Sequence, residues 1–182
     1  ADDVAGALEA AKKGMTADSK AQNPALLSLE LMSHKVSDAE PLVQQALRQQ
    51  SGTELAMSYV RILIELERYA DATTQLQAIT RKDPKLADVW LVLGSLQFEQ
   101  GQDKEAEASL ARYVNLTLQA PSDNSTRGLT QAQTRRAALL ARQGKMVEAR
   151  QLIAQLPANT ADEDRNRFLA EVQLLRDHRQ WQ

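Results

Sequence analysis

Few residues in this chain combine a reactive side chain with a partner at a useful spacing. His34 and His178 are the 2 histidines of the 182 residues, and an imidazole could act as a general base or bind a metal ion. They stand several helices apart in the sequence. Each falls where a helix is expected to end, a position at which a histidine interacts favourably with the helix dipole. We therefore interpret both as polar residues at helix C-termini and not as a shared site.

Acidic residues cluster in FEQGQDKEAE (98–107) and TADEDR (160–165). Paired carboxylates could serve as acid and base or bind calcium, but the second stretch lacks the glycine and the distal glutamate of a calcium loop. Asp162, Glu163 and Asp164 are better placed as the N-cap and first turn of a helix, where negative charge meets the dipole. The sequence contains no glycine-rich phosphate loop, no histidine pair four residues apart and no nucleophile elbow, so we predict no catalytic, cofactor or metal site.

The composition predicts a folded and largely helical chain. Hydrophobic residues make up 43% and charged residues 25%, with 7 Gly and 5 Pro, which is not the signature of disorder. The 22 Lys and Arg nearly balance the 24 Asp and Glu, so charge gives no reason to expect nucleic acid as a partner. The absence of cysteine excludes disulfides and thiolate ligands. No apolar run approaches the ~20 residues that cross a bilayer, so we expect no membrane-spanning segment.

A repeated pattern organises the chain. Residues 59–76, 93–110 and 136–153 share one arrangement of Leu, Ala and aromatic residues, and a fainter copy lies at 26–43. The offset between the first two copies is 34 residues, and the next offset is 43. Each copy holds two amphipathic segments of roughly 12 to 15 residues around a short turn, which predicts a helical hairpin.

Small residues at fixed places predict how the two helices of a hairpin meet. Gly94 and Ala106 lack bulk and let two helices approach closely, and Gly101 permits a left-handed turn between them. Trp90 and Leu93 share one helix face with Gly94. A single hairpin cannot cover its own apolar faces, whereas stacked hairpins can, which gives an array with a concave inner surface.

The 34-residue unit resembles the tetratricopeptide repeat. The resemblance rests on an early Trp, a Leu-Gly pair, a Gly at the turn, an Ala and a Leu in the second helix and a terminal Pro, here Trp90, Leu93, Gly94, Gly101, Ala106, Leu110 and Pro84. Gln97 departs from the pattern, in which Tyr is usual, and Val60 and Ala137 replace the mid-helix Gly. The resemblance implies an all-α, right-handed superhelical solenoid of antiparallel helix pairs with about ten helices.

The repeat register divides residues 1–182 into a single array. We expect a half repeat (a second helix) at 1–18, repeats at 20–52, 53–86, 87–119 and 130–162, an inserted loop at 120–129 and a half repeat (a first helix) at 163–182. The loop is placed by the turn-forming residues of APSDNSTRG. Half repeats at both ends lead us to expect a segment of a longer array. Arrays of this kind are similar to long repeat proteins of Gram-negative bacteria, and this favours a periplasmic or outer-membrane-associated protein over a cytoplasmic one.

Residues that contact a partner are expected on the inner face of the first helix of each repeat. Carried onto this sequence, the resemblance gives a partner-binding groove of Leu31, Met32, Met57, Arg61, Ile64, Glu65, Leu91, Ser95, Phe98, Glu99, Thr134 and Arg142, with Ala138 beside them. Apolar side chains among them indicate either a strip that receives a partner or packing between neighbouring repeats. The Lys and Asn set with which some members clamp the C-terminal carboxylate of a peptide is absent from the matching positions.

These features predict a non-catalytic scaffold that binds a protein or peptide through its concave face. The alternative is a structural spacer or a self-association segment whose open half repeats pair with a longer chain or form a homo-oligomer. A third hypothesis is that the array regulates an enzyme domain elsewhere in a longer chain.

Overall fold

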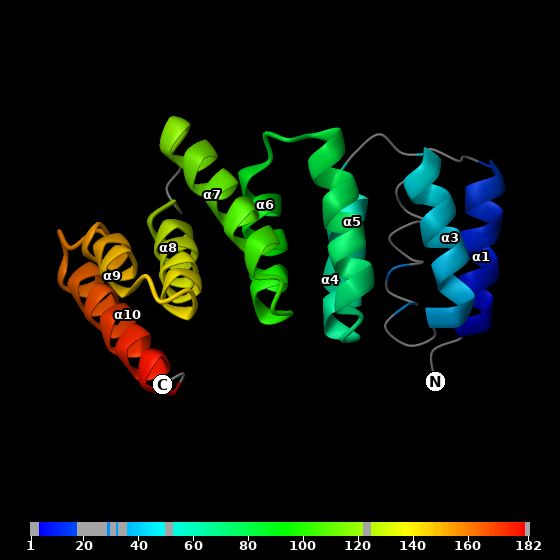
Figure 1. Ribbon diagram of the computed structural model, residues 1–182. Coiled ribbons are helices and arrows are strands. Elements are labelled where there is room, and N and C mark those ends of the chain that lie inside the picture. The colour runs from blue at the N-terminus through cyan, green and yellow to red at the C-terminus, as the bar shows by residue number, and fades with distance from the viewer. Residues whose placement is uncertain are drawn as a thin grey trace. The chain divides into compact units, whose positions relative to one another are not determined.

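The computed structural model describes residues 4–17, 29, 32, 36–49, 53–121 and 125–180 (Figure 1). These residues form helices joined by turns, and none of them lies in a strand. The chain divides into two compact units, residues 1–79 and 80–182. The predicted all-α class and the helix-pair architecture are confirmed.

The first unit contains α1 (Val4–Ala17), α3 (Val36–Gln49), α4 (Glu54–Glu65) and most of α5 (Tyr69–Lys82). Helix α3 packs against α1 on one side and α4 on the other. Its buried residues follow the i, i+3, i+4, i+7 spacing of one helix face: Ala39, Leu42, Val43 and Ala46. Burial of this stripe holds α3 between its neighbours.

The second unit contains α6 (Ala87–Glu99), α7 (Asp103–Gln119), α8 (Ser125–Arg142), α9 (Met146–Ala154) and α10 (Ala161–Gln180). Helices α6 and α7 pack as one pair and α8 and α9 as the next, and α7 also contacts α8 (Figure 1). Helix α10 packs on both α8 and α9. Each pair covers an apolar face of the pair beside it, as in a solenoid.

Within each pair of the second unit, the same kind of turn joins the first helix to the second. Gly101 and Gly144 have positive φ angles of 70° and 77°. The Gly101 N–H donates to the carbonyl of Phe98 (3.1 Å), and the Gln102 N–H donates to the carbonyl of Gln97 (2.9 Å). This pair of bonds is the Schellman motif, which satisfies the last carbonyls of a helix. The predicted left-handed turn at Gly101 is confirmed.

A third copy of this turn uses glutamate in place of glycine. Glu67 has a φ of 58°, and its N–H donates to the carbonyl of Ile64 (3.0 Å), while the Arg68 N–H donates to Leu63 (2.8 Å). The left-handed residues 67, 101 and 144 are separated by 34 and 43 residues, the two offsets of the sequence pattern. The repeat is therefore a property of the backbone as well as of the sequence.

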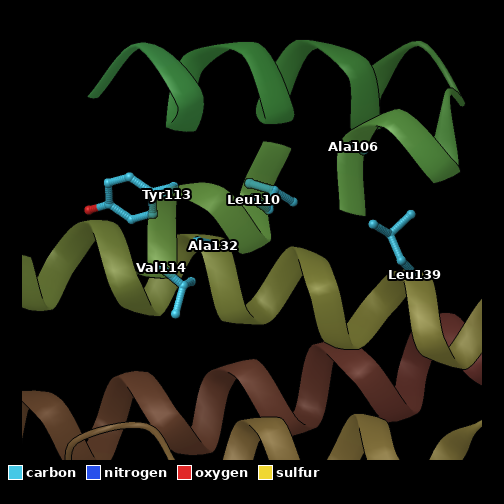
Figure 2. Close-up of a cluster of buried hydrophobic side chains, with 6 residues drawn as sticks. All are labelled: Ala106, Leu110, Tyr113, Val114, Ala132 and Leu139. Atoms are coloured by element: carbon cyan, nitrogen blue, oxygen red, sulfur yellow. The ribbon is translucent and has the colours of Figure 1, made fainter. Parts of the chain in front are cut away.

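The core of the second unit begins where α7 lies between α6 and α8. Its buried members are Ala106, Leu110, Tyr113, Val114, Ala132 and Leu139 (Figure 2). A Cβ atom on Gly94 would lie 2.7 Å from Cγ of Leu110 and 3.1 Å from its backbone nitrogen, closer than side chains pack. The predicted close approach of the two helices at Gly94 is therefore confirmed.

A buried polar pair explains one departure from the family pattern. Gln97, which stands where Tyr is usual, is almost fully buried in α6, and its side-chain oxygen accepts a hydrogen bond of 2.7 Å from the hydroxyl of Ser109 in α7. A buried amide without a partner would cost stability. Ser109 removes part of that cost and ties the two helices of the pair together.

A second cluster continues the core across the next pair. Its buried residues come from three helices and the turn after α9: Ala137, Ala149, Ile153, Leu156, Ala170 and Leu174. Ala137 and Ala149 are fully buried where α8 meets α9, so small residues again mark the crossing of a helix pair.

The inserted loop is shorter than expected. Helix α8 begins at Ser125, so the prediction that 120–129 forms a loop is wrong for residues 125–129. Gly128, which falls within the expected loop, is instead buried within the helix, where an added Cβ would lie 1.9 Å from the Tyr113 hydroxyl oxygen and 3.4 Å from Leu91. Turn-forming residue types predicted the loop, and tertiary packing of α8 on α7 overrides them.

Replacement of Glu67 by glycine is expected to raise the free energy of unfolding by about 0.5–1 kcal/mol. The left-handed backbone costs a non-glycine residue ~1–2 kcal/mol, and glycine removes this cost. Glycine also raises the conformational entropy of the unfolded chain, which offsets part of the stabilisation. Urea denaturation followed by circular dichroism measures the change. Glu67→Ala is the control, because alanine keeps the backbone penalty; equal stabilisation by alanine would show that the carboxylate is responsible instead.

Gly128→Ala is expected to destabilise the chain by about 1–3 kcal/mol, because the new methyl group overlaps the Tyr113 ring. An exposed helical glycine should behave in the opposite way, and Gly6→Ala in α1 is the control, with an expected gain of up to ~1 kcal/mol. Adding Tyr113→Phe, which removes the nearest atom, should recover part of the loss. Additive effects of the two substitutions in a double-mutant cycle would contradict the proposed contact.

Candidate functional site

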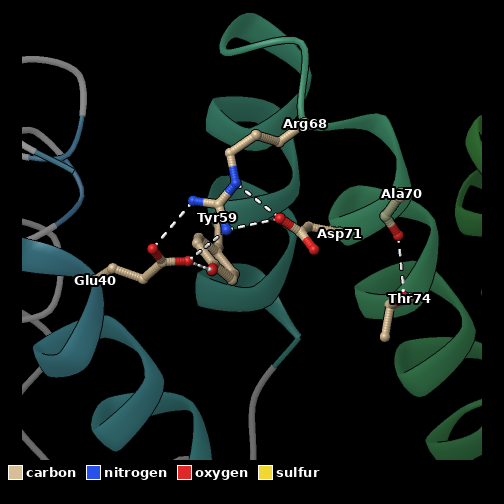
Figure 3. A network of polar contacts seen from close by, with 6 residues as sticks. All are labelled: Glu40, Tyr59, Arg68, Ala70, Asp71 and Thr74. Atoms are coloured by element: carbon tan, nitrogen blue, oxygen red, sulfur yellow. Dashed lines mark hydrogen bonds and ion pairs between the residues drawn. The ribbon is translucent and has the colours of Figure 1, made fainter. Parts of the chain in front are cut away.

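One network of charged side chains lies within the first unit. The guanidinium of Arg68 donates to both carboxylate oxygens of Glu40 (2.9 and 3.0 Å) and to Asp71 (2.7 Å), and the Tyr59 hydroxyl donates to Glu40 (2.5 Å) (Figure 3). These residues come from α3, α4, the α4–α5 turn and α5. The network therefore joins three helices through two-pronged, charge-assisted hydrogen bonds.

The pKa values of Glu40, Tyr59 and Arg68 are shifted toward the protonation states that the network uses. Hydrogen bonds from Arg68 lower the pKa of Glu40 despite the opposing effect of burial. Burial, followed by the bond to Glu40, raises the pKa of Tyr59 to about 12. Hydrogen bonds to Glu40 and Asp71 raise the pKa of Arg68. A general acid or base needs a pKa near neutrality, and these shifts move all three pKa values away from it. The hydrogen bonds of Glu40, Tyr59 and Arg68 instead hold the three helices together.

The sequence did not predict this network. Glu40 and Arg68 lie 28 residues apart, and neither residue belongs to the repeat pattern. Arg68 follows the left-handed residue of the turn, so the Schellman geometry sets the direction of its side chain.

Of the two groove residues predicted in the first repeat, the structure describes Met32. Leu31 lies outside the described residues. Met32 has an exposed fraction of 0%, so the prediction of a groove contact is wrong for this residue, because its thioether side chain fills the core of the first unit.

The predicted residues of α4 lie along one side of that helix. Met57, Arg61 and Ile64 follow a spacing of four and three residues, and Glu65 is next to them. Met57 and Ile64 are half-buried, whereas Arg61 and Glu65 are exposed. Their contact with a partner stays a prediction.

The predicted residues of α6 and α8 meet around one aromatic ring. The guanidinium carbon of Arg142 lies 4.5 Å from the centre of the Phe98 ring, and that of Arg135 lies 5.9 Å from it. Arg142 also donates to Asp103 at the start of α7 (2.9 Å), and Arg135 lies 3.7 Å from Glu99. Cation–π and ion-pair contacts thus cover Phe98 with the basic side of α8.

The other predicted residues of α6 take part in the same contact between repeats. Leu91 and Phe98 pack against the core cluster of α7 and α8. The hydroxyl oxygen of Ser95 and Nε of Arg135 are buried, and within the described part of the chain neither has a hydrogen-bond partner. The packing alternative accounts for Leu91 and Phe98, and only Glu99 of this set is mainly exposed.

A groove opens between α8 and α10. It has a volume of about 610 Å³ and is lined by Thr126, Arg127, Thr130, Gln131, Thr134, Glu163, Asn166 and Ala170. Thr134 is the predicted site residue that lines it. The others were missed because Thr126 and Arg127 fell in the expected loop and because Asn166 lies on a half repeat to which no site residue was assigned.

Local bonding occupies some of the polar groups in this groove. The hydroxyls of Thr130 and Thr134 donate to the carbonyls of Thr126 and Thr130 (2.9 and 2.8 Å). Within the residues that the structure describes, the side chains of Arg127, Gln131 and Asn166 make no hydrogen bond or ion pair. These three groups remain able to bind a ligand.

Glu163 at the end of the groove caps α10. Its carboxylate accepts hydrogen bonds from the backbone N–H groups of Asn159 (2.9 Å) and Thr160 (3.2 Å), and the Thr160 hydroxyl accepts one from the Glu163 N–H (3.2 Å). This is a capping box. The predicted role of the acidic stretch as a first helical turn is confirmed, with Thr160 in place of Asp162 as the cap.

The described residues hold neither a metal-binding cluster nor a membrane-spanning helix. In 4–17, 29, 32, 36–49, 53–121 and 125–180, no three His, Asp or Glu side chains gather closely enough to hold a metal ion. Within the same part of the chain, every helix is too short or too polar to cross a membrane.

Comparison with known proteins places the repeats in a family. The family model of the tetratricopeptide repeat matches residues 63–122, from the end of α4 to the end of α7. This part of the chain is therefore built of tetratricopeptide repeats. No curated protein matches the sequence.

Two solved structures share the fold of this chain. The crystal structure of MamA is similar with a TM-score of 0.59 and 15% identity over 96% of this chain and 92% of that one. The crystal structure of YrrB, described as a TPR protein with an unusual peptide-binding site, has a TM-score of 0.59 and 19% identity over 96% and 93%. At these identities the likeness concerns the fold.

The Glu40 network predicts a pH-dependent stability. Because the folded-state pKa of Glu40 lies below its ordinary value of 4.5, the stabilisation is complete above that pH and is lost as the pH falls through the folded pKa. Glu40→Gln should lower the free energy of unfolding by about 1–3 kcal/mol at neutral pH. Urea denaturation at a series of pH values should show the two proteins converging below pH 4.5.

Tyr59 should cause a second change in stability, at alkaline pH, so that the plot of unfolding free energy against pH has an acid limb and an alkaline limb. Since the folded pKa is about 12 against 10.0 for an ordinary tyrosine, stability should fall as the pH rises between these values, and Tyr59→Phe should remove that fall. Glu65→Gln, which changes an exposed carboxylate of α4, is the control and should leave both limbs unchanged. An acid limb that persists in Glu40→Gln would assign it to other groups.

Proposed function

We propose that this chain is a non-catalytic scaffold that binds an extended segment of a protein or peptide in the groove between α8 and α10. The observation that supports this proposal most is the set of unengaged polar side chains, Arg127, Gln131 and Asn166, along one hollow of about 610 Å³. A binding site needs polar groups that are held in place by a rigid helix and are not already bonded.

The chemistry of this groove matches a peptide main chain. The amides of Gln131 and Asn166 each donate and accept hydrogen bonds, as the peptide group does. Gln131 lies on α8 and Asn166 on α10, so the two amides approach the groove from different helices. A segment lying between them would satisfy its backbone groups on both sides.

The length of the groove also suits an extended segment. Arg127, Gln131 and Thr134 follow the i, i+4, i+7 spacing of one face of α8. Seven residues of helix rise by about 10 Å, which about three extended residues span at ~3.3 Å each. Ala170 contributes a small side chain to the opposite wall and leaves room for the side chains of the segment.

Charge argues against a polyanion as the occupant. The groove carries Arg127 together with Glu163, and the chain has a formal net charge of −2. A nucleic acid would require a continuous basic surface. A peptide of mixed polarity is a better match, and the likeness to YrrB, a TPR protein with an unusual peptide-binding site, is consistent with this kind of ligand.

Selection of short peptides from a random phage-displayed library tests the proposal. Peptides enriched on the wild-type chain should bind Asn166→Ala and Gln131→Ala on the order of 10-fold more weakly, because each substitution removes about 1–3 kcal/mol of hydrogen bonding. Fluorescence polarisation measures the dissociation constants, and thermal melting verifies that the variants remain folded.

Gln151→Ala is the matched control. Gln151 lies in α9 and lines a different hollow, between α9 and α10, so its replacement should leave the affinity unchanged. Equal loss of affinity in Gln151→Ala, or unchanged affinity in both groove variants, would place the peptide elsewhere and contradict the proposal.

A further inference from the structure

Helix α10 carries a stripe of exposed apolar side chains. Phe168, Val172 and Leu175 follow the i, i+4, i+7 spacing of one helix face and are 64%, 45% and 41% exposed, and Leu169 beside them is 55% exposed. Ala170 and Leu174, on another face of the same helix, are buried against α8 and α9. Helix α10 therefore has an inner apolar face that is covered and an outer one that is open.

The repeat register shows how such a stripe is used elsewhere in the unit. Phe168, Val172 and Leu175 lie 77 residues after Leu91, Ser95 and Phe98, and the buried Ala170 and Leu174 keep the same register with the buried Leu93 and Gln97. In α6 this stripe is covered by α8, which packs on Leu91 and Phe98. The outer stripe of α10 thus occupies the repeat position at which, in α6, another helix packs.

We propose that the α10 stripe (Phe168, Leu169, Val172 and Leu175) binds the same stripe of a second copy of this chain. A contiguous exposed apolar face of this kind marks an interaction surface. Two copies related by a twofold axis present identical surfaces to each other, so the contact closes as a dimer and leaves no stripe exposed.

The charges at the two ends of the stripe set the direction of pairing. Asp164 lies one turn before Phe168, and Arg176 lies one turn after Val172. Antiparallel packing places Asp164 of each copy opposite Arg176 of the other when Phe168 lies opposite Val172. Parallel packing would place like charges together. A twofold axis perpendicular to the two α10 helices gives this antiparallel arrangement, which also opposes the two helix dipoles favourably.

The dimer surface is distinct from the peptide groove. The groove is lined on α10 by Glu163, Asn166 and Ala170, whereas the stripe uses other residues of that helix. Self-association and peptide binding can therefore fail independently, and Asn166→Ala should leave the dimer intact.

Sedimentation velocity over a range of protein concentrations tests the proposal. The wild-type chain should show a concentration-dependent dimer, and Phe168→Glu and Val172→Glu should each raise the dimer dissociation constant at least ~10-fold, since a buried charge opposes association. Both side chains are largely exposed in the single chain, so the variants should retain the wild-type melting temperature at low concentration.

A charge exchange tests the direction. Asp164→Arg and Arg176→Asp should each weaken the dimer, and the two together in one chain should restore it, because the opposed pair is then re-formed with reversed signs. A double variant weaker than both single variants would overturn the antiparallel arrangement.

Leu118→Glu is the matched control. Leu118 is 65% exposed on α7 and outside the stripe, so this change should leave the dimer unaffected. A chain that stays monomeric at all concentrations would overturn the proposal, as would a dimer that Leu118→Glu disrupts and Phe168→Glu does not.

Discussion

The close approach of two helices within each pair is the constraint on which the rest of the structure depends. At Gly94 the backbone of α6 lies so near Leu110 of α7 that a methyl group has no room. Ala106 and Ala149 are fully buried at equivalent crossings. Because the backbones touch, the larger side chains are directed to the flanks of each pair, where they meet the next pair. The small residues thus determine which side chains are left for contacts between repeats and with other molecules.

The residues at one position of the repeat show that the neighbouring helices determine how far a side chain is buried. Leu91, Thr134 and Phe168 occupy the same place in three successive first helices, at offsets of 43 and 34 residues. Leu91 packs on the core, Thr134 lines a polar groove, and Phe168 is 64% exposed. The backbone gives each of these side chains the same direction. The neighbouring helix determines whether the side chain packs in the core, lines a groove or is exposed to solvent.

Local and periodic features could be predicted from the sequence, and features of the tertiary structure could not. The left-handed turn at Gly101 and the close packing at Gly94 depend on residues within one hairpin, so their spacing was sufficient. The early start of α8 depends on Gly128 meeting Tyr113, and the burial of Met32 depends on the core around it. Glu40 and Arg68 meet across 28 residues with no motif. The groove between α8 and α10 was missed for the same reason, since Gln131 and Asn166 converge only after packing.

The pairing of Glu40 with Arg68 makes the coupling between neighbouring repeats titratable. In an array of repeats, each unit has its own stability and an interface energy with the next, and the interface energies make unfolding cooperative. The Glu40 carboxylate belongs to α3, and Arg68 belongs to the turn of the following hairpin, so protonation weakens the interface more than either hairpin. Acid should therefore weaken the coupling between α3 and the α4–α5 hairpin and make the unfolding of the first unit less cooperative.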